Sequence, residues 1–259
     1  MPADAVGILD AFFSRYLGCD LGGTASGETC IVASPRRFAA EVGYGPIFAI
    51  WILMTRGRCG ASLQQPLAAE AKRILGDDGV GSTLDRECRS ALTELVCRAV
   101  GRRDVTAVSG PILFCTRESL RPQSLHPCRR VGPGDVPALV RAGLHNDSLA
   151  EAIDAGFCFA AWSGGEVACV AATNPIDAVR AADGVADIGI NTAAAHRRQG
   201  FGKTALSALT AALLEAGCVP VYAASDHNEP SIRTATSVGY VQYAWQFRVQ
   251  VARQGGCRS

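Results

Sequence analysis

Two kinds of hydrophobic spacing alternate along this chain and predict a mixed α/β protein. In the first half, Leu9, Phe12, Phe13 and Tyr16 recur at helical spacing and predict a helix over Ala5–Leu17. Continuous apolar runs bounded by polar or turn residues predict buried strands. The other elements predicted before residue 117 are strands at Thr29–Ala33, Pro46–Thr55 and Val105–Thr116 and helices at Pro66–Leu75 and Thr83–Val100.

The second half follows a segment, Arg117–Pro133, whose arginines and prolines predict a linker. Gly164 and Gly165 can adopt the positive φ of a tight turn, so they predict a β-hairpin. Leu206, Leu209 and Leu213 share one face of a predicted helix. The elements predicted here are helices reaching from Asp135 to Arg141, at Ser148–Ala155, at Gly202–Ala216 and from Asn228 or Glu229 to Gly239, and strands at Phe157–Ser163, Glu166–Thr173, Val185–Thr192, Val219–Ala224 and Tyr240–Val251.

Composition narrows the class of protein. With 48% hydrophobic residues among 259, the chain has enough apolar side chains to fold, and its length fits one large or two small domains. A net charge of +1 argues against bulk nucleic-acid binding, which needs a broad excess of Lys and Arg. No apolar run reaches the ~20 residues that span a bilayer, and no secretion signal precedes the first helix. We therefore expect a cytoplasmic protein that binds neither nucleic acid nor membrane.

The eleven cysteines are the most unusual feature of the composition. Their number is odd, and no two stand in the C-x-x-C spacing typical of structural zinc sites. Cys158 and Cys169 lie in apolar runs, where a free cysteine packs as a small hydrophobe. We expect reduced core thiols and no metal; a metal site or a redox pair is the alternative.

The chemistry is concentrated in the turn His196-Arg197-Arg198-Gln199-Gly200-Phe201-Gly202-Lys203-Thr204, which joins a predicted strand to a predicted helix. The first amides of a helix have no internal acceptor, and they lie at the positive end of the helix dipole. With two glycines and three basic side chains beside them, these amides predict a phosphate or diphosphate site. The alternative is a solvated basic helix start with glycines for turning.

Three phosphate-binding patterns compete for this turn. Gly202-Lys203-Thr204 matches the end of a Walker A loop, but Arg197 stands where that loop needs its first glycine. Gly200-x-Gly202 with Ala205 fits a loose dinucleotide fingerprint, but the fingerprint expects its first glycine directly after the strand. Arg197-x-x-Gly200-x-Gly202 resembles the R/Q-x-x-G-x-G/A diphosphate loop of the GNAT-type N-acetyltransferases.

The resemblance to the GNAT superfamily extends over residues 123–254. In that superfamily a hairpin and a central strand precede the loop, an amphipathic helix and a strand follow it, and an Asn begins the next helix, here Asn228. The resemblance implies a mixed, mostly antiparallel sheet flanked by helices. Residues 1–120 are outside it; we expect there a smaller α/β domain of unknown role, which could be a degenerate GNAT-like half.

The resemblance also implies a cofactor, acetyl-CoA, and the residues that bind it. In the family, main-chain groups of the central strand hold the pantetheine arm and polarise the thioester carbonyl, and the loop holds the diphosphate. On this sequence those roles fall to Ile190, Asn191 and Thr192 in the strand, to Arg197, Arg198, Gln199, Gly200, Phe201, Gly202, Lys203 and Thr204 in the loop, and to Asn228 and Ser231 at the next helix.

The implied reaction is direct transfer of an acyl group from acetyl-CoA to a primary amine. Many family members carry the acid, a Tyr, seven residues after the Asn, but here that position is Ala235. We predict that Tyr222 takes the role of this acid; Tyr240 and Tyr243 are further tyrosines nearby. Asp187 in the central strand and His227 at the end of the next strand are the predicted base or amine-binding groups.

Two functions of different classes follow from the same residues. The first is a catalytic N-acetyltransferase acting on a small-molecule or peptide amine, as a monomer or homodimer. The second is an acyl-CoA-binding regulatory or interaction protein without turnover, which the alanine at position 235 favours. The sequence identifies neither the acceptor nor the length of the acyl chain.

Overall fold

The computed structural model describes residues 5–23, 27–41, 44–76, 84–101, 104–146, 148–174 and 184–252. These residues form two compact units. Unit 1 holds the described residues up to Ile112 and from Tyr243 on, and unit 2 is Leu113–Gln242. The chain therefore leaves unit 1 within β4 (Val105–Phe114) and returns to it at the start of β10 (Val241–Val251). The division at residues 120–123 expected from the sequence, with the last strand in the second domain, stays a prediction.

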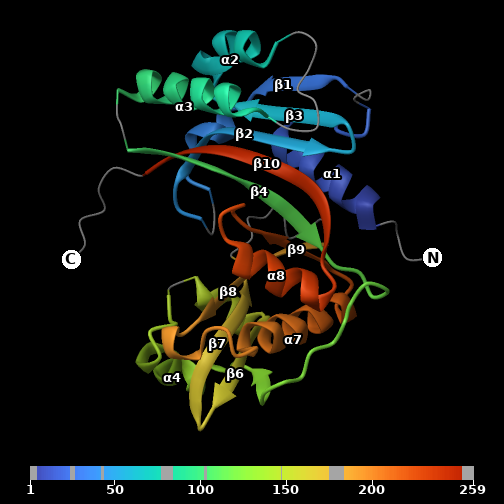
Figure 1. The fold of residues 1–259 in the computed structure, drawn as a ribbon, viewed down its shortest axis with the longest axis vertical. Helices are drawn as coiled ribbons and strands as arrows, with labels where there is room; N and C mark the ends of the chain where they lie inside the picture. Colours follow the sequence, from blue (N-terminus) through green and yellow to red (C-terminus); the bar gives the residue numbers. More distant parts are fainter. Residues whose placement is uncertain are drawn as a thin grey trace. The chain divides into compact units, whose positions relative to one another are not determined.

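Unit 1 is built on a mostly antiparallel sheet with strand order β1-β3-β2-β10-β4 (Figure 1). The hairpin of β2 and β3 turns at Arg56 and Gly57, both with positive φ, and β10 adds to β2 in the antiparallel sense. Only β1 and β3 run parallel among the pairings of this unit that the structure describes. The further strands are β1 (Thr29–Ala33), β2 (Ile47–Thr55) and β3 (Arg58–Leu63).

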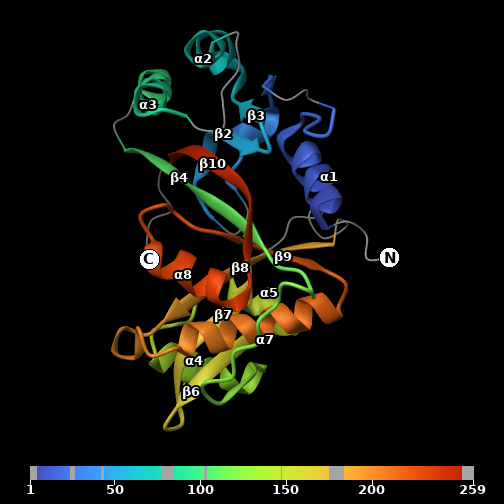
Figure 2. The ribbon, with the colours of Figure 1, turned by 45° about the vertical axis from the view of Figure 1, so that its right-hand side comes forward.

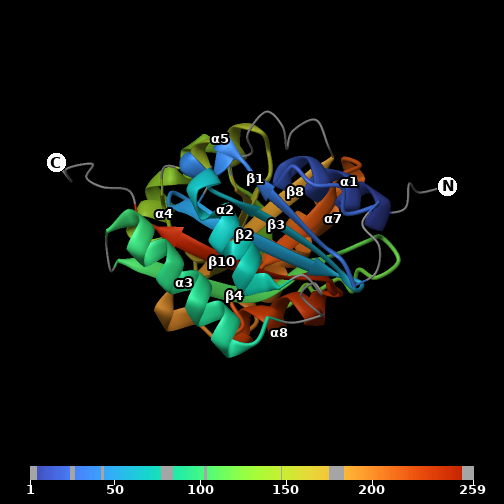
Figure 3. The same ribbon diagram turned by 90° about the horizontal axis from the view of Figure 1, so that it is seen from above.

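Helices cover both faces of the unit 1 sheet. Residues of α2 (Ala68–Leu75) and α3 (Arg86–Val100) pack with the apolar face of β2, β3 and β10, as the view from above in Figure 3 shows. On the other face, Tyr16 of α1 (Ala5–Leu17) contacts Trp51 with ring centroids 5.0 Å apart. Asp85 caps α3 by accepting a hydrogen bond from the amide of Cys88.

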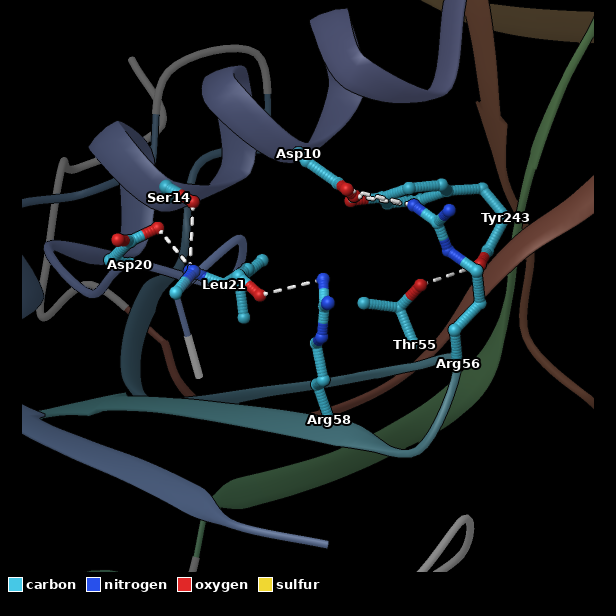
Figure 4. A network of polar contacts seen from close by, with 9 residues as sticks. Asp10, Ser14, Asp20, Leu21, Thr55, Arg56, Arg58 and Tyr243 are labelled. Atoms are coloured by element: carbon cyan, nitrogen blue, oxygen red, sulfur yellow. Dashed lines mark hydrogen bonds and ion pairs between the residues drawn. The ribbon is translucent and has the colours of Figure 1, made fainter. Parts of the chain in front are cut away.

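A polar network joins α1 to β10 and to the β2–β3 turn (Figure 4). The carboxylate of Asp10 accepts a 2.7 Å hydrogen bond from the Tyr243 hydroxyl and two from Arg56, at 2.8 and 3.0 Å. The Thr55 hydroxyl donates to the carbonyl of Tyr243 at 3.1 Å. Residues 233 positions apart in the sequence are thereby held together.

In unit 2 the strands of the sheet follow the order β9-β8-β7-β6-β5. The strands are antiparallel except for β8 and β9, which are parallel. The predicted Gly164-Gly165 hairpin is present, with φ of 55° and 88°. Its strands are β5 (Cys128–Arg130), β6 (Cys158–Ser163), β7 (Glu166–Thr173), β8 (Val185–Thr192) and β9 (Val219–Ala223).

Helices cover these strands on both faces, and β7 is therefore buried over all but its first residue. α7 (Phe201–Glu215) packs against β6, β7 and β8 (Figure 2), and its Leu206, Leu209 and Leu213 are buried there. Each fully buried Leu contributes about 2 kcal/mol of hydrophobic free energy. The other helices are α4 (Val136–Arg141) and α5 (Leu149–Asp154), which pack with Cys158, Ala160 and Val170, and α8 (Glu229–Val238), which packs beside α7.

The structure confirms a mixed α/β fold with a mostly antiparallel sheet, and it adds two strands that the sequence pattern does not predict. The first is β3, whose small residues Cys59, Gly60 and Ala61 give a weak strand signal. The second is β5, inside the segment expected to be a linker. The predicted helix start at Thr83 lies outside the described residues, which resume at Leu84.

Candidate functional site

A cleft of about 790 Å³ lies in unit 2 where β8 ends and α7 begins. Every residue that we expected to bind the cofactor lines it, except Thr204. Thr204 is buried beneath the cleft wall, where its Oγ1 accepts a hydrogen bond from the amide of Leu125. The cleft also contains residues that the sequence did not single out as ligands: Leu125, His196, Pro230 and Thr234.

The loop before α7 has an unusual backbone conformation at the wall of this cleft. Arg198 has φ of +62° and Gly200 has φ of +91°, and a positive φ is costly for a residue with a side chain such as Arg198. Left-handed residues in such a turn orient successive amides toward one side, which creates an anion-binding concavity. Among the residues that the structure describes, none accepts a hydrogen bond from the amides of residues 199–203.

The start of α7 continues this row of amides. The first bond of the helix closes at the amide of Thr204, which donates to the carbonyl of Gly200 at 3.2 Å. The amides of Phe201, Gly202 and Lys203 therefore precede the ladder, at the positive end of the helix dipole. Arg197, Arg198 and Lys203 add their side-chain charges at the cleft wall. The arrangement fits a diphosphate in both charge and hydrogen-bond donors.

His126 braces the loop from a distant part of the sequence. Its Nε2 lies 2.7 Å from the carbonyl oxygen of Gln199, and its ring stacks on Phe201 with centroids 3.7 Å apart. A Cβ on Gly200 would come within 2.8 Å of the Leu125 side chain, so the loop and residues 125–126 are in close contact. No local sequence pattern indicates this contact, because the partners are 73 residues apart.

The strand before the loop has an edge without a neighbouring strand. β8 pairs with β9 only from Val185 to Asp187, although both strands continue beyond that point. On its other side β8 pairs with β7 from Ile188 to Thr192. The main-chain groups of Ile190, Asn191 and Thr192 that face away from β7 therefore border the cleft. This edge can accept an extended, amide-bearing ligand in the manner of an added strand.

Asn228 and Ser231 approach the cleft from the start of α8. The Asn228 side chain accepts a 3.3 Å hydrogen bond from the amide of Ser231, so it caps the helix. The hydroxyl of Ser231 lies 2.6 Å from that of Tyr222. Both Asn228 and Ser231 line the cleft, so the capping role of Asn228 does not remove it from the site.

Tyr222, Asp187 and His227, the predicted catalytic residues, do not line the cleft themselves. Tyr222 is buried and reaches the cleft only through Ser231; burial raises the pKa of Tyr222 to about 12. Asp187 is 8% exposed and accepts a 2.8 Å hydrogen bond from Asn174 Nδ2. The side chain of His227 is 96% exposed, with Asp226 3.6 Å away.

Ala235, at the position of the usual acid, is fully buried in the core between α8 and the sheet. Tyr240 is also buried, and its hydroxyl is 2.8 Å from that of Thr210. Tyr243 belongs to unit 1 and hydrogen-bonds Asp10. Of the tyrosines we considered, Tyr222 alone is hydrogen-bonded to a cleft residue among the contacts that the structure describes.

The ten cysteines among the described residues are free thiols. Burial raises the pKa of the Cys169 thiol, which accepts a hydrogen bond from Thr192 near the cleft, to about 11. A thiol with so high a pKa is a poor nucleophile at neutral pH. Within the described ranges, no three His, Cys, Asp or Glu side chains gather as a metal site would require. No helix in that part of the chain is long and apolar enough to cross a membrane.

Comparison with known proteins assigns this region to a family. The model of the acetyltransferase (GNAT) family matches residues 133–240, which include β6 to β9, the loop and α8. No curated protein sequence matches the chain at a significant level.

Solved structures resemble the chain at low sequence identity. An X-ray structure of a Drosophila protein shares 13% identity with a TM-score of 0.50, covering 80% of this chain and 76% of that one. A GNAT-family acetyltransferase from Colwellia psychrerythraea shares 14% identity with a TM-score of 0.49, covering 73% and 75%. A Salmonella typhimurium protein solved with its cofactor acetyl-CoA shares 17% identity with a TM-score of 0.36, covering 51% and 97%. At these identities, structural likeness concerns the fold alone.

Proposed function

Because residues 133–240 belong to the acetyltransferase (GNAT) family, we propose that this protein transfers the acetyl group of acetyl-CoA to a primary amine by direct attack. The observation that carries the proposal is that one cleft holds both the unpaired edge of β8 and the amide-rich start of α7. Packing alone explains neither feature, since parallel strands gain by continued pairing and Arg198 gains nothing from a positive φ.

The loop would hold the diphosphate of coenzyme A. The amides of residues 199–203 donate to its oxygens, and Arg197, Arg198 and Lys203 offset its negative charge. Gly200 leaves room for the close approach that these bonds require, because any side chain there would meet Leu125.

The edge of β8 would hold the amide-bearing pantetheine arm of coenzyme A by main-chain hydrogen bonds at residues 190–192. Acetyl-CoA supplies an acyl group activated as a thioester. A main-chain N–H on this edge is placed to donate to the thioester oxygen as negative charge develops there, and one such donor is worth about 3 kcal/mol in transition-state stabilisation.

Ser231 and Tyr222 would provide the proton for the departing thiolate. Ser231 lines the cleft, and its hydroxyl shares a 2.6 Å hydrogen bond with Tyr222. Because the pKa of Tyr222 is raised by burial, its hydroxyl stays protonated throughout the neutral range and can return a proton to Ser231. This pair, which comes from β9 and α8, would stand in for the tyrosine that Ala235 replaces.

Asp187 would attract the incoming amine. It is the last residue of β8 that pairs with β9, directly before the opened edge, and its buried carboxylate is oriented by Asn174. A proton from the amine would leave through water, because Asp187 does not border the cleft itself. We do not assign the base to His227, whose side chain is almost fully exposed.

The test is an acceptor screen with free-thiol detection, combined with calorimetric titration of acetyl-CoA. We expect acetyl-CoA to bind and at least one amine to release thiol above the rate of hydrolysis. Gly200→Trp fills the approach to the loop and serves as the cofactor-site control. If acetyl-CoA bound equally well to this variant, the loop would not be its site.

A second function, acyl-CoA binding without turnover, is favoured by Ala235. Tight binding with no thiol release across small amines, amino acids and peptide N-termini would support it over the transferase.

A further inference from the structure

Unit 1 carries a row of polar side chains on the sheet face that α1 covers. Arg248 of β10 lies directly opposite Trp51 of β2, and Trp51 lies directly opposite Ser62 of β3, so the three side chains share one face. Gln246 stands two residues before Arg248 on that face. Because neighbouring strands lie about 4.8 Å apart, the row is about 10 Å wide, the size of a small organic molecule.

These side chains are buried, yet at least one polar atom of each has no hydrogen-bond partner among the residues that the structure describes. Ser62 is 0% exposed, Gln246 1%, Trp51 4% and Arg248 7%. The atoms concerned are the Arg248 Nε, the Trp51 indole nitrogen, the Ser62 hydroxyl and both polar atoms of the Gln246 amide. Each orphaned polar atom of this kind costs free energy, so four such side chains together require an explanation.

The opposite face of the same three strands shows that packing does not demand polar residues here. Phe247, Ile52 and Ala61 form the corresponding row on that face, and all three belong to an apolar core. One sheet therefore carries an apolar row on one side and an unsatisfied polar row on the other.

The cation of this row has no carboxylate partner among the residues that the structure describes. The Arg248 guanidinium lies over the rings of Phe48 and Tyr44, at 4.8 and 5.2 Å, and forms no ion pair with a described carboxylate. The Arg37 guanidinium, which is buried, lies 5.5 Å from the Trp51 ring. Glu41, 3.9 Å from Arg37, is the one buried carboxylate that the structure describes in this unit.

We propose that this face of unit 1 binds a small carboxylate that also carries a hydroxyl or amino group. The carboxylate would accept hydrogen bonds from Arg248, Trp51 and Ser62 and offset the charge of the Arg248 guanidinium. A hydroxyl or amino hydrogen on the same ligand would donate to the Gln246 carbonyl oxygen, which a simple oxyanion could not satisfy. The rings of Phe48 and Trp51, which contact each other edge to face with centroids 5.6 Å apart, would border the carbon skeleton of the ligand.

The test uses the full chain without acetyl-CoA and L-lactate as the probe, because lactate has a carboxylate and a hydroxyl but no amine for the proposed acetyltransferase site. Binding is followed by the melting temperature and by tryptophan fluorescence, to which Trp51 contributes. Acetate lacks the second donor, and inorganic phosphate is also expected to bind the α7 loop, so both are run in parallel.

We expect lactate to raise the melting temperature and change the fluorescence, with a dissociation constant at least tenfold below that of acetate. Gly200→Trp should leave the lactate response intact, and Arg248→Met should abolish it. Trp51→Phe and Gln246→Met, which nearly preserve side-chain volume, should weaken lactate binding at least tenfold even if Arg248→Met does not fold. Arg233→Met, which removes an exposed arginine of α8, is the matched control and should respond like the wild type.

The proposal is overturned if lactate has no effect, or if Trp51→Phe and Gln246→Met respond like the wild type. A response to phosphate that equals the response to lactate and persists in Gly200→Trp would also overturn it, because it would show an oxyanion site with no use for Gln246. None of these results depends on whether unit 2 catalyses acetyl transfer.

Discussion

Within the described parts of the chain, the two units leave polar atoms without partners in opposite ways. In unit 2 the atoms are main-chain amides at the start of α7 and along the edge of β8, and they border a cleft. In unit 1 they are side-chain atoms of Arg248, Trp51, Ser62 and Gln246, and they are buried. Water can solvate amides in a cleft while no ligand is bound, whereas buried atoms cost free energy until something pairs with them. The first arrangement suits a substrate that enters and leaves in every turnover, and the second suits a ligand that stays.

The largest effect should come from blocking the unit 2 cleft, where main-chain amides are proposed to bind acetyl-CoA. Gly200→Trp places a side chain at a φ of +91°, within 2.8 Å of Leu125. We expect kcat/KM for acetyl-CoA to fall about 1,000-fold, or about 4 kcal/mol in transition-state binding. Gly217→Trp is the control, because Gly217 also has a positive φ, of +81°, but has open space around it. Equal losses in both variants would mean that backbone strain, and not the cleft, is responsible.

Tyr222→Phe tests whether the Tyr222 hydroxyl contributes to proton transfer at the unit 2 cleft. Loss of the hydrogen bond to Ser231 should lower kcat 10- to 100-fold, about 1.4 to 2.8 kcal/mol, and leave KM for acetyl-CoA within twofold. Tyr240→Phe is matched to it, since it removes an equally buried hydroxyl bonded to Thr210. That control should lower stability by about 1 kcal/mol with kcat unchanged. A fall in kcat in both variants, in proportion to lost stability, would exclude a proton-transfer role for Tyr222.

Tyr243→Phe removes a hydrogen bond within unit 1 and leaves the cleft of unit 2 unchanged. The Tyr243 hydroxyl donates to Asp10, so its loss should lower the free energy of unfolding by about 1.5 kcal/mol, while the affinity for acetyl-CoA stays the same. Burial, and then the Asp10 charge, raises the pKa of Tyr243 above its ordinary value of 10. The neutral form is therefore favoured in the folded state, and wild-type stability should decline as pH rises above about 10. Chemical denaturation at pH 7 and pH 10.5 measures both effects; a decline of the same size in Tyr243→Phe would point to another group.

His126→Ala removes the brace on the loop. The loop must then be ordered by the ligand, so we expect the dissociation constant of acetyl-CoA to rise about fivefold, or about 1 kcal/mol. His145→Ala, at an exposed histidine, is the control in the same titration. An unchanged affinity in His126→Ala would show that Arg198 and Gly200 hold their conformation without help.

The smallest effect concerns a structural carboxylate of unit 2. A hydrogen bond from Arg129 lowers the pKa of Asp135 to about 2. The charged form is therefore favoured on folding, and its contribution is present above pH 4 and is lost as pH falls through 2. Arg129 is half exposed, so solvent screening should keep this contribution to about 1 kcal/mol or less. In Asp135→Asn the free energy of unfolding should fall less steeply between pH 4 and 2 than in the wild type. An unchanged pH dependence in this range would contradict the assignment.

The sequence predicted unit 2 better than unit 1 for a physical reason. In unit 2 the hairpin, β8, α7 and β9 are each specified by local signals such as the Gly164-Gly165 turn and the leucine stripe of α7. In unit 1 the partner of β2 along its open edge is β10, about 200 residues later in the chain, and no local pattern specifies that pairing. The small residues of β3 likewise form a strand because neighbours pair with them.

By itself the sequence determined the mixed α/β class, the GNAT resemblance and the loop from Arg197 to Lys203, because turn glycines, helix starts and apolar periodicity act over a few residues. Only the tertiary structure decided that β8 and β9 part after Asp187, that His126 stacks on Phe201, and that Tyr222 reaches the cleft through Ser231. It also decided that Arg248, Trp51 and Ser62 form one buried row. These arrangements depend on register and contact between distant segments, and the free energy that selects them belongs to the packed fold and not to any segment within it.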